Sequence, residues 1–149
     1  MSETMNDRFR VWFCGDESAC SFAEQLWTAL QEWDDIEDEG KCEDYNGLIS
    51  WLAFGKEYQP FFAAHSHLLR PAFLQLYLSW TSANVLDRGD WQDVCKSYML
   101  RAGFYQLLHL IAWICGGDAW ARRVGPEIYR SYAETPEEIF KEFNRCQDQ

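Results

Sequence analysis

Three histidines are the first side chains in this sequence that could do chemistry. His65 and His67 stand two residues apart, so they share a face on an extended strand but not on a helix. His109 lies between two leucines in the most apolar part of the chain, where a histidine typically hydrogen-bonds a carbonyl group in the core. Metal sites need several convergent ligands. One hypothesis is nevertheless a small helical metal-dependent enzyme or metal-binding protein that uses these three residues.

The cysteines and the absence of catalytic motifs point away from an enzyme. The six cysteines, at positions 14, 20, 42, 95, 115 and 146, form no C-x-x-C pair and fit no zinc-site spacing. The polar N-terminus has no apolar segment typical of a signal peptide, so we expect free thiols and a cytoplasmic protein. A G-x-S-x-G elbow, a phosphate-binding glycine loop and an H-E-x-x-H motif are also absent. The sequence therefore favours a non-catalytic protein with no metal and no cofactor.

The densest charge lies between residues 32 and 44, where eight carboxylates stand against a single lysine and the net charge is −7. Like charges crowded into so short a segment repel one another, and a basic partner would relieve that repulsion. Trp33 lies at the edge of a predicted acidic loop over residues 34–46 and Tyr45 lies inside it; both are residue types that commonly anchor interfaces. We predict a partner-binding surface made of Trp33, Asp34, Asp35, Glu37, Asp38, Glu39, Glu43, Asp44 and Tyr45.

Part of the same segment matches the EF-hand calcium loop. With Gly40 as the sixth position, the ligand positions are Asp35, Glu37, Glu39, Lys41 (through its carbonyl), Glu43 and Asn46. Positions three and five then carry glutamate where the shorter aspartate or asparagine fits the tight loop. Position twelve is Asn46, which cannot supply a bidentate carboxylate. The sequence therefore argues against a calcium site.

The composition is that of one folded, acidic domain. The chain has 149 residues and a net charge of −11, and 48% of its residues are hydrophobic and 17% aromatic. So much apolar surface supports a core and excludes disorder, while the negative charge disfavours direct contact with nucleic acid. The most apolar segment, residues 102–117, is shorter than the roughly 20 residues that cross a membrane. We expect it to be a buried helix, with no membrane contact.

Periodicity and capping signals predict an all-α protein, a single compact domain over residues 1–149 with about six to seven helices and a central apolar helix pair. We expect residues 1–8 to be flexible and residues 9–14 to be strand-like. Helices are expected over 21–33, 47–56, 60–70, 71–86, 91–115, 118–132 and 136–144. The helix over 71–86 is apolar on nearly all sides, which indicates a central position.

Three helix boundaries carry particular signals. Pro71 fits the first turn of a helix, where its missing N–H is not needed. Gly116-Gly117 fits a helix end, because glycine readily adopts the left-handed conformation. Thr135, followed by Pro136 and by Glu138 three residues on, predicts a capping box.

These features favour a non-catalytic acidic binding protein that occupies a basic site on a protein partner. Clustered carboxylates can imitate phosphate groups, so a nucleic-acid-binding site is one kind of basic site that they would suit. Inhibitors, immunity proteins and anti-defence proteins are functions that this chemistry suits. A further alternative is a subunit of an oligomer, possibly with identical chains, because eight tryptophans are many for a core of this size.

Overall fold

A computed structural model describes residues 4–40, 45–53 and 55–149, and within these ranges the chain is helical with no strand. This confirms the all-α prediction, and the helices form a single compact arrangement. Their bounds are α1 Met5–Trp12, α2 Glu17–Glu39, α3 Tyr45–Ala53, the 3-10 helix η1 Gly55–Tyr58, α4 Pro60–Ala64, α5 Ser66–Leu86, α6 Trp91–Arg101, α7 Gly103–Arg130 and α8 Pro136–Gln147. No helix among these residues combines the length and apolar character needed to cross a lipid bilayer.

The first helix corrects one expectation about the N-terminus. Thr4 and Asp7 form a reciprocal capping box that starts α1, so residues 5–8 are helical, and the flexibility of residues 1–8 stays a prediction. Phe9, Trp12 and Phe13 then follow at helical spacing, and all three are buried. The strand-like interpretation of residues 9–14 was therefore wrong, because burial of one helical face decides the conformation of this short apolar run.

The second helix is longer than predicted at both ends. It begins after Asp16, whose carboxylate accepts a hydrogen bond from the backbone N–H of Ala19 at 3.0 Å, instead of at Ser21. It ends at Gly40, which has the left-handed φ of 67°. The predicted acidic loop over 34–46 was thus wrong for residues 34–39, which are helical. Residues 41–44 lie outside the described part of the chain.

Two further boundaries differ from the prediction because of backbone turns that carry no strong sequence signal. His65 has φ −121° and ψ 24°, so α4 ends there and α5 has begun before the chain reaches Pro71. Pro71 lies inside α5 rather than at its start. Similarly, a turn at Ala102 divides the predicted helix over 91–115 into α6 and the first part of α7.

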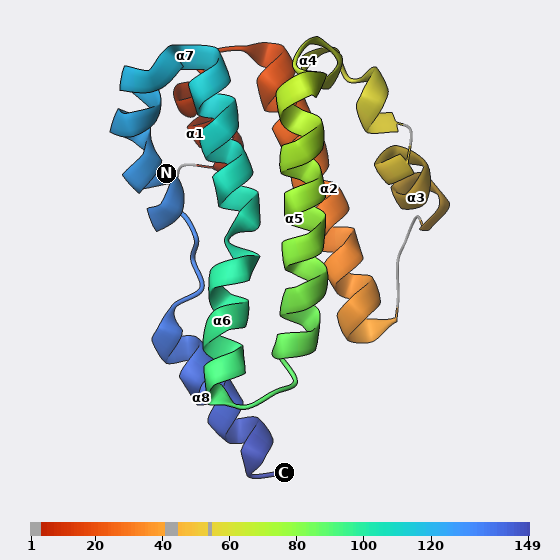
Figure 1. The fold of residues 1–149 in the computed structure, drawn as a ribbon, viewed down its shortest axis with the longest axis vertical. Helices are drawn as coiled ribbons and strands as arrows, with labels where there is room; N and C mark the ends of the chain where they lie inside the picture. The colour runs from red at the N-terminus through yellow and green to blue at the C-terminus, as the bar shows by residue number, and fades with distance from the viewer. Residues whose placement is uncertain (1–3, 41–44, 54) are drawn as a thin grey trace.

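The predicted stop at Gly116-Gly117 and the capping box at Thr135 are both confirmed. Gly117 has φ 83° and ψ −178°, which breaks α7 into two parts that turn back on each other. Figure 1 shows the second part descending beside the first. Thr135 and Glu138 form the reciprocal hydrogen bonds of a capping box at the start of α8.

Aromatic packing joins the helices around one core. Phe22 of α2 lies 5.6 Å from Phe62 and 6.2 Å from Phe61 of α4, measured between ring centroids, and all three are almost completely buried. In Figure 1, α5 and the α6–α7 pair lie side by side in the middle, with α2 beside α5 and α8 at the lower end. The central position predicted for the helix over 71–86 agrees with this arrangement, although one face of α5 is exposed at Leu74, Tyr77, Leu78 and Val85.

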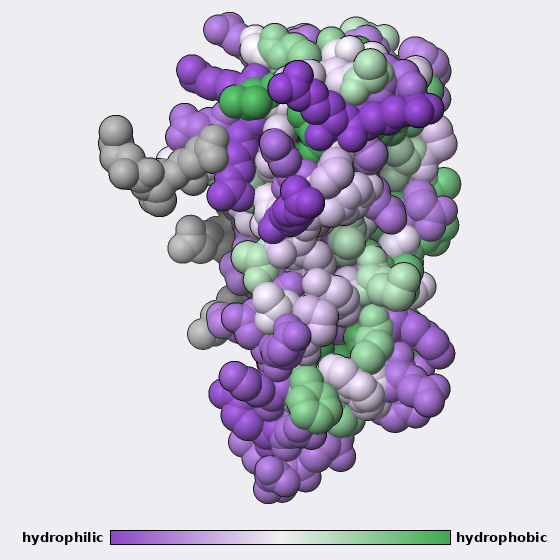
Figure 2. Space-filling view, turned by 90° about the vertical axis from the view of Figure 1, so that its left-hand side faces the viewer, coloured by the Kyte–Doolittle hydropathy of each residue, from purple (hydrophilic) through white to green (hydrophobic). Residues whose placement is uncertain are grey.

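The side of the molecule that carries the second part of α7 is largely hydrophilic. Figure 2 shows that its hydrophobic residues lie in separate patches. Arginines contribute to this character, because Arg122, Arg123 and Arg130 are all exposed on this part of α7. Five of the acidic residues singled out in the sequence belong to another region, the last turns of α2: Asp34, Asp35, Glu37, Asp38 and Glu39.

Candidate functional site: an acidic cleft

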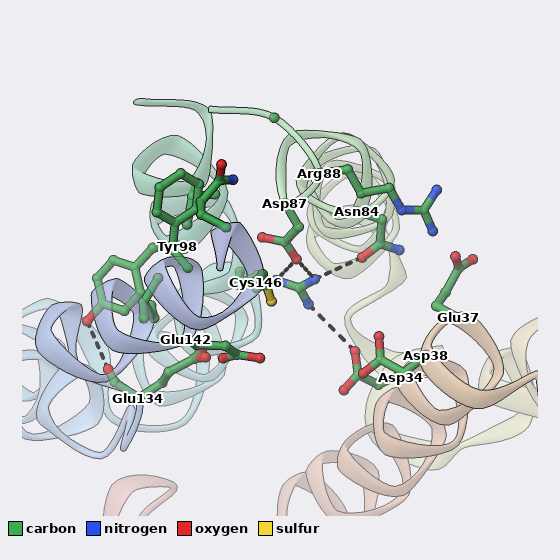
Figure 3. A pocket seen from close by; sticks show the side chains of 16 residues that line it. Asp34, Glu37, Asp38, Asn84, Asp87, Arg88, Tyr98, Glu134, Glu142 and Cys146 are labelled. Carbon is green, nitrogen blue, oxygen red and sulfur yellow. Dashed lines mark hydrogen bonds and ion pairs between the residues drawn. The ribbon is translucent and has the colours of Figure 1, made fainter. Parts of the chain in front are cut away.

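A cleft of about 510 Å³ opens where the C-terminal ends of α2 and α5 meet α6 and α8. Its charged side chains come from all four of these regions, and acids outnumber bases. The carboxylates that line it are Asp34, Glu37, Asp38, Asp87, Glu134 and Glu142, and the two guanidinium groups are Arg88 and Arg101. Figure 3 shows the α2 carboxylates opposite Asp87 and Asn84. The cleft therefore presents a net negative lining.

Arg101 of α6 holds the walls of the cleft together. Its guanidinium contacts the carboxylate of Asp87, donates a hydrogen bond to Asn84 at 3.1 Å and lies 3.6 Å from Asp34 (Figure 3). Burial opposes its charge, but the hydrogen bond and charge of Asp87 outweigh burial and raise the pKa of Arg101. The hydroxyl of Ser97, which is completely buried, also donates to Asp87. The guanidinium of Arg101 thus forms its contacts within the protein.

Asp34 is the partly buried acid of the α2 wall. Burial and then the negative charge of Asp38 raise its pKa, although Arg101 acts in the opposite direction. Glu37 and Asp38 are exposed, and within the described chain neither forms an ion pair. A cation that entered the cleft would consequently find carboxylates that no described residue neutralises.

The α8 side of the cleft is set by tyrosine contacts. Tyr98 of α6 stacks on Tyr132 with ring centroids 5.1 Å apart, and its hydroxyl donates to the backbone carbonyl of Glu134 at 3.1 Å. Trp91 packs against Phe140 and Phe143 at 5.0 and 5.6 Å, which places α8 along α6. These contacts bring Glu134 and Glu142 to the cleft (Figure 3).

The structure brings together only part of the predicted binding surface. Asp34, Glu37 and Asp38 line the cleft, whereas Asp35 and Glu39 are exposed on α2 and do not line it. Glu43, Asp44 and the side chain of Tyr45 lie outside what the structure describes.

Trp33 has an internal packing role. Its ring lies 5.6 Å from that of Tyr77 and stacks on Trp80 at 6.2 Å, so it joins α2 to α5. It is only partly exposed. Trp33 therefore takes part in internal packing, and only the exposed part of its ring could contact a partner.

Sequence reasoning missed the cleft residues outside α2. Asp87, Arg88, Arg101, Glu134 and Glu142 were not considered as site residues. The one sequence signal was the predicted end of the helix over 71–86, which places Asp87 and Arg88 directly after α5. Contacts such as Arg101–Asp34 join residues far apart in the chain, and no local pattern predicts them.

The histidines are not gathered into a site. His109 lies 2.9 Å from the carbonyl oxygen of Ala121 through its Nε2 atom, as expected for a core histidine. His65 packs on Phe61, and His67 is exposed. Across the described residues, no group of three or more histidine, cysteine, aspartate or glutamate side chains is arranged to hold a metal.

The partial EF-hand match is contradicted by the local backbone. Its first three ligand positions, Asp35, Glu37 and Glu39, lie on the last turns of α2 rather than in a loop. Residues two apart on a helix point to different faces, so these carboxylates cannot converge on one ion as the EF-hand requires.

Comparison with known proteins finds no family model, no curated protein and no solved structure that matches this chain.

Proposed function

We propose that this protein is a non-catalytic acidic binding protein that occupies a basic site on a protein partner, in the manner of an inhibitor, immunity or anti-defence protein. The cleft and the adjoining end of α2 are the binding surface. The observation that carries the proposal is the set of carboxylates on the last turns of α2 that have no ion-pair partner in the described chain.

These carboxylates lie at the C-terminal end of α2, where negative charge is least favourable. The C-terminal end of a helix carries partial negative charge, so acids there are unfavourable by about 0.3–1 kcal/mol each at exposed positions. The last turn of α2 holds Glu37, Asp38 and Glu39 and has no basic residue. This arrangement costs stability that a basic partner would restore on binding, which supports a role in recognition.

A second candidate function is that of a subunit in an oligomer. The exposed apolar face of α5, formed by Leu74, Tyr77, Leu78 and Val85, favours it, because such faces are commonly covered by another chain. Sedimentation of the purified protein at low concentration distinguishes a dimer from a monomer.

The main proposal is tested with matched baits in lysate from the source cells. The wild-type protein is compared with Glu37→Lys/Asp38→Lys, which reverses two unpaired charges. The control is Glu17→Lys/Glu127→Lys, which makes the same change of net charge at two exposed residues. Glu17 begins α2, about 30 Å along the helix from Asp38.

We expect the wild-type and control baits to capture the same basic protein and the cleft variant to lose it. Capture should weaken as salt rises, because the attraction is between partly solvated charges. Equal capture by all three baits, or loss with both variants, would count against this surface.

A further inference from the structure

The exposed face of α5 carries an apolar stripe, which Thr81 interrupts between Leu78 and Val85. Leu74, Leu78 and Val85 stand four and then seven residues apart, so they fall on one side of the helix. Their exposed fractions are 56%, 48% and 71%, and Tyr77 beside them is 43% exposed. Leu74 and Val85 are 11 positions apart in sequence, which is about 17 Å along the helix axis. That length matches about three turns of a second helix.

The stripe and the acidic cleft adjoin. Val85 lies in the last turn of α5, next to Asn84, and Asn84, Asp87 and Arg88 line the cleft. On its other border, Tyr77 contacts Trp33, which lies one turn before Glu37 on α2. A helix lying along the stripe therefore reaches Glu37 and Asp38, which form no ion pair with any described residue, at one end.

We propose that the α5 stripe is the apolar half of the same interface and that its occupant is a basic amphipathic helix of a protein partner. Apolar side chains of that helix pack on Leu74, Leu78 and Val85, and its lysines or arginines reach Glu37 and Asp38. This inference rests on the proposed function and adds to it the secondary structure and pattern of the partner.

Charge argues against a second copy of this chain as the occupant. Each copy carries a net charge of −11 and presents the same acidic α2 end beside its own stripe. Face-to-face packing of two stripes would bring these acids toward a chain of the same sign, which is unfavourable. Near the N-terminal end of the stripe, Arg70 is neutralised by Glu57 at 2.6 Å and offers a second copy little attraction. A basic helix would instead be attracted by the acids along this border.

The test uses a synthetic 18-residue peptide of leucine and lysine, with leucines at helical spacing on one face. Its binding is measured by fluorescence anisotropy to the wild type, to Leu78→Ser/Val85→Ser and to Glu37→Gln/Asp38→Asn. The control is Val11→Ser, since Val11 is 53% exposed on α1. All substituted positions are exposed, so the fold should be retained, and circular dichroism checks this.

We expect each double variant to bind the peptide about tenfold more weakly than the wild type and the control to bind equally. A leucine–glutamate peptide of the same pattern should not bind. If only the Glu37/Asp38 variant weakens binding, the helix inference is wrong while the acidic surface stands. If neither variant does, or the wild type does not bind the peptide, the inference fails as well.

Sedimentation provides the remaining outcome. A wild type that is dimeric and becomes monomeric in Leu78→Ser/Val85→Ser would show that a second copy covers the stripe, and it would overturn the proposed occupant. The lysate experiment would still report separately on the acidic surface.

Discussion

Asp34 is a cleft carboxylate whose charge the folded state disfavours. It is partly buried beside Asp38, and the attraction of Arg101 at 3.6 Å does not fully offset burial and repulsion. A carboxylate with a raised pKa holds its proton more tightly in the folded state than in the unfolded state. Ionisation of Asp34 at neutral pH therefore works against folding.

The raised pKa of Asp34 predicts the direction in which its replacement changes the free energy of unfolding. At pH 7, Asp34→Asn should raise the free energy of unfolding, because the substitution removes a charge that the folded state disfavours. The gain should shrink as pH falls through the raised pKa and vanish below the ordinary value of 3.8, where Asp34 is protonated in both states. Urea unfolding at several pH values measures it.

Asp35→Asn, at an exposed position on the same helix, is the control for this experiment. It should change the free energy of unfolding little at any pH. Loss of stability in Asp34→Asn at pH 7 would mean that the contact with Arg101 outweighs burial.

The elements show which structural features a single sequence encodes. Thr135 with Glu138 and Gly117 were predicted correctly, because capping and left-handed backbone conformations depend on residues that are close in sequence. The end of α2 at Gly40 follows the same chemistry, but the acidic composition of residues 34–39 concealed it. The divisions at His65 and Ala102 depend on how helices pack, which local signals do not specify.

The candidate site was predictable to a lesser degree. Local charge density identified Asp34, Glu37 and Asp38, all of which line the cleft. The opposite wall was missed because Asp87 reaches the cleft only through the packing of α5 against α6. The helical position of residues 34–39 also mattered, since it directs some carboxylates into the cleft and leaves Asp35 and Glu39 outside it.

The helix dipole of α2 predicts that lysines at its two ends change the free energy of unfolding in opposite directions. Glu37→Lys/Asp38→Lys places cations at the C-terminal end of α2 and should raise the free energy of unfolding by about 1 kcal/mol at low salt. Glu17→Lys, in the first turn of the same helix, should lower it by a similar amount. Urea unfolding gives both values. Destabilisation by both variants would contradict the view that the α2 acids cost stability.

Over the whole molecule, charge is distributed unevenly. The acidic cleft lies at the C-terminal ends of α2 and α5, whereas Arg8 of α1 and Arg130 of α7 line a separate hollow of about 310 Å³. Arg122 and Arg123 lie on the same part of α7 as Arg130. If the proposed basic partner exists, such an asymmetric field would turn it toward the acidic end as it approaches and speed productive encounter.

The association rate constant between the wild type and the basic protein captured from lysate, measured by stopped-flow fluorescence over a range of salt concentrations, tests the central claim most directly. We expect the rate constant to fall by about tenfold or more as salt rises from low to high concentration. Replacement of Asp35, Glu37, Asp38 and Glu39 by lysine should slow association at low salt and flatten this dependence. Identical, salt-insensitive rate constants for the two proteins would contradict recognition through the acidic end of α2.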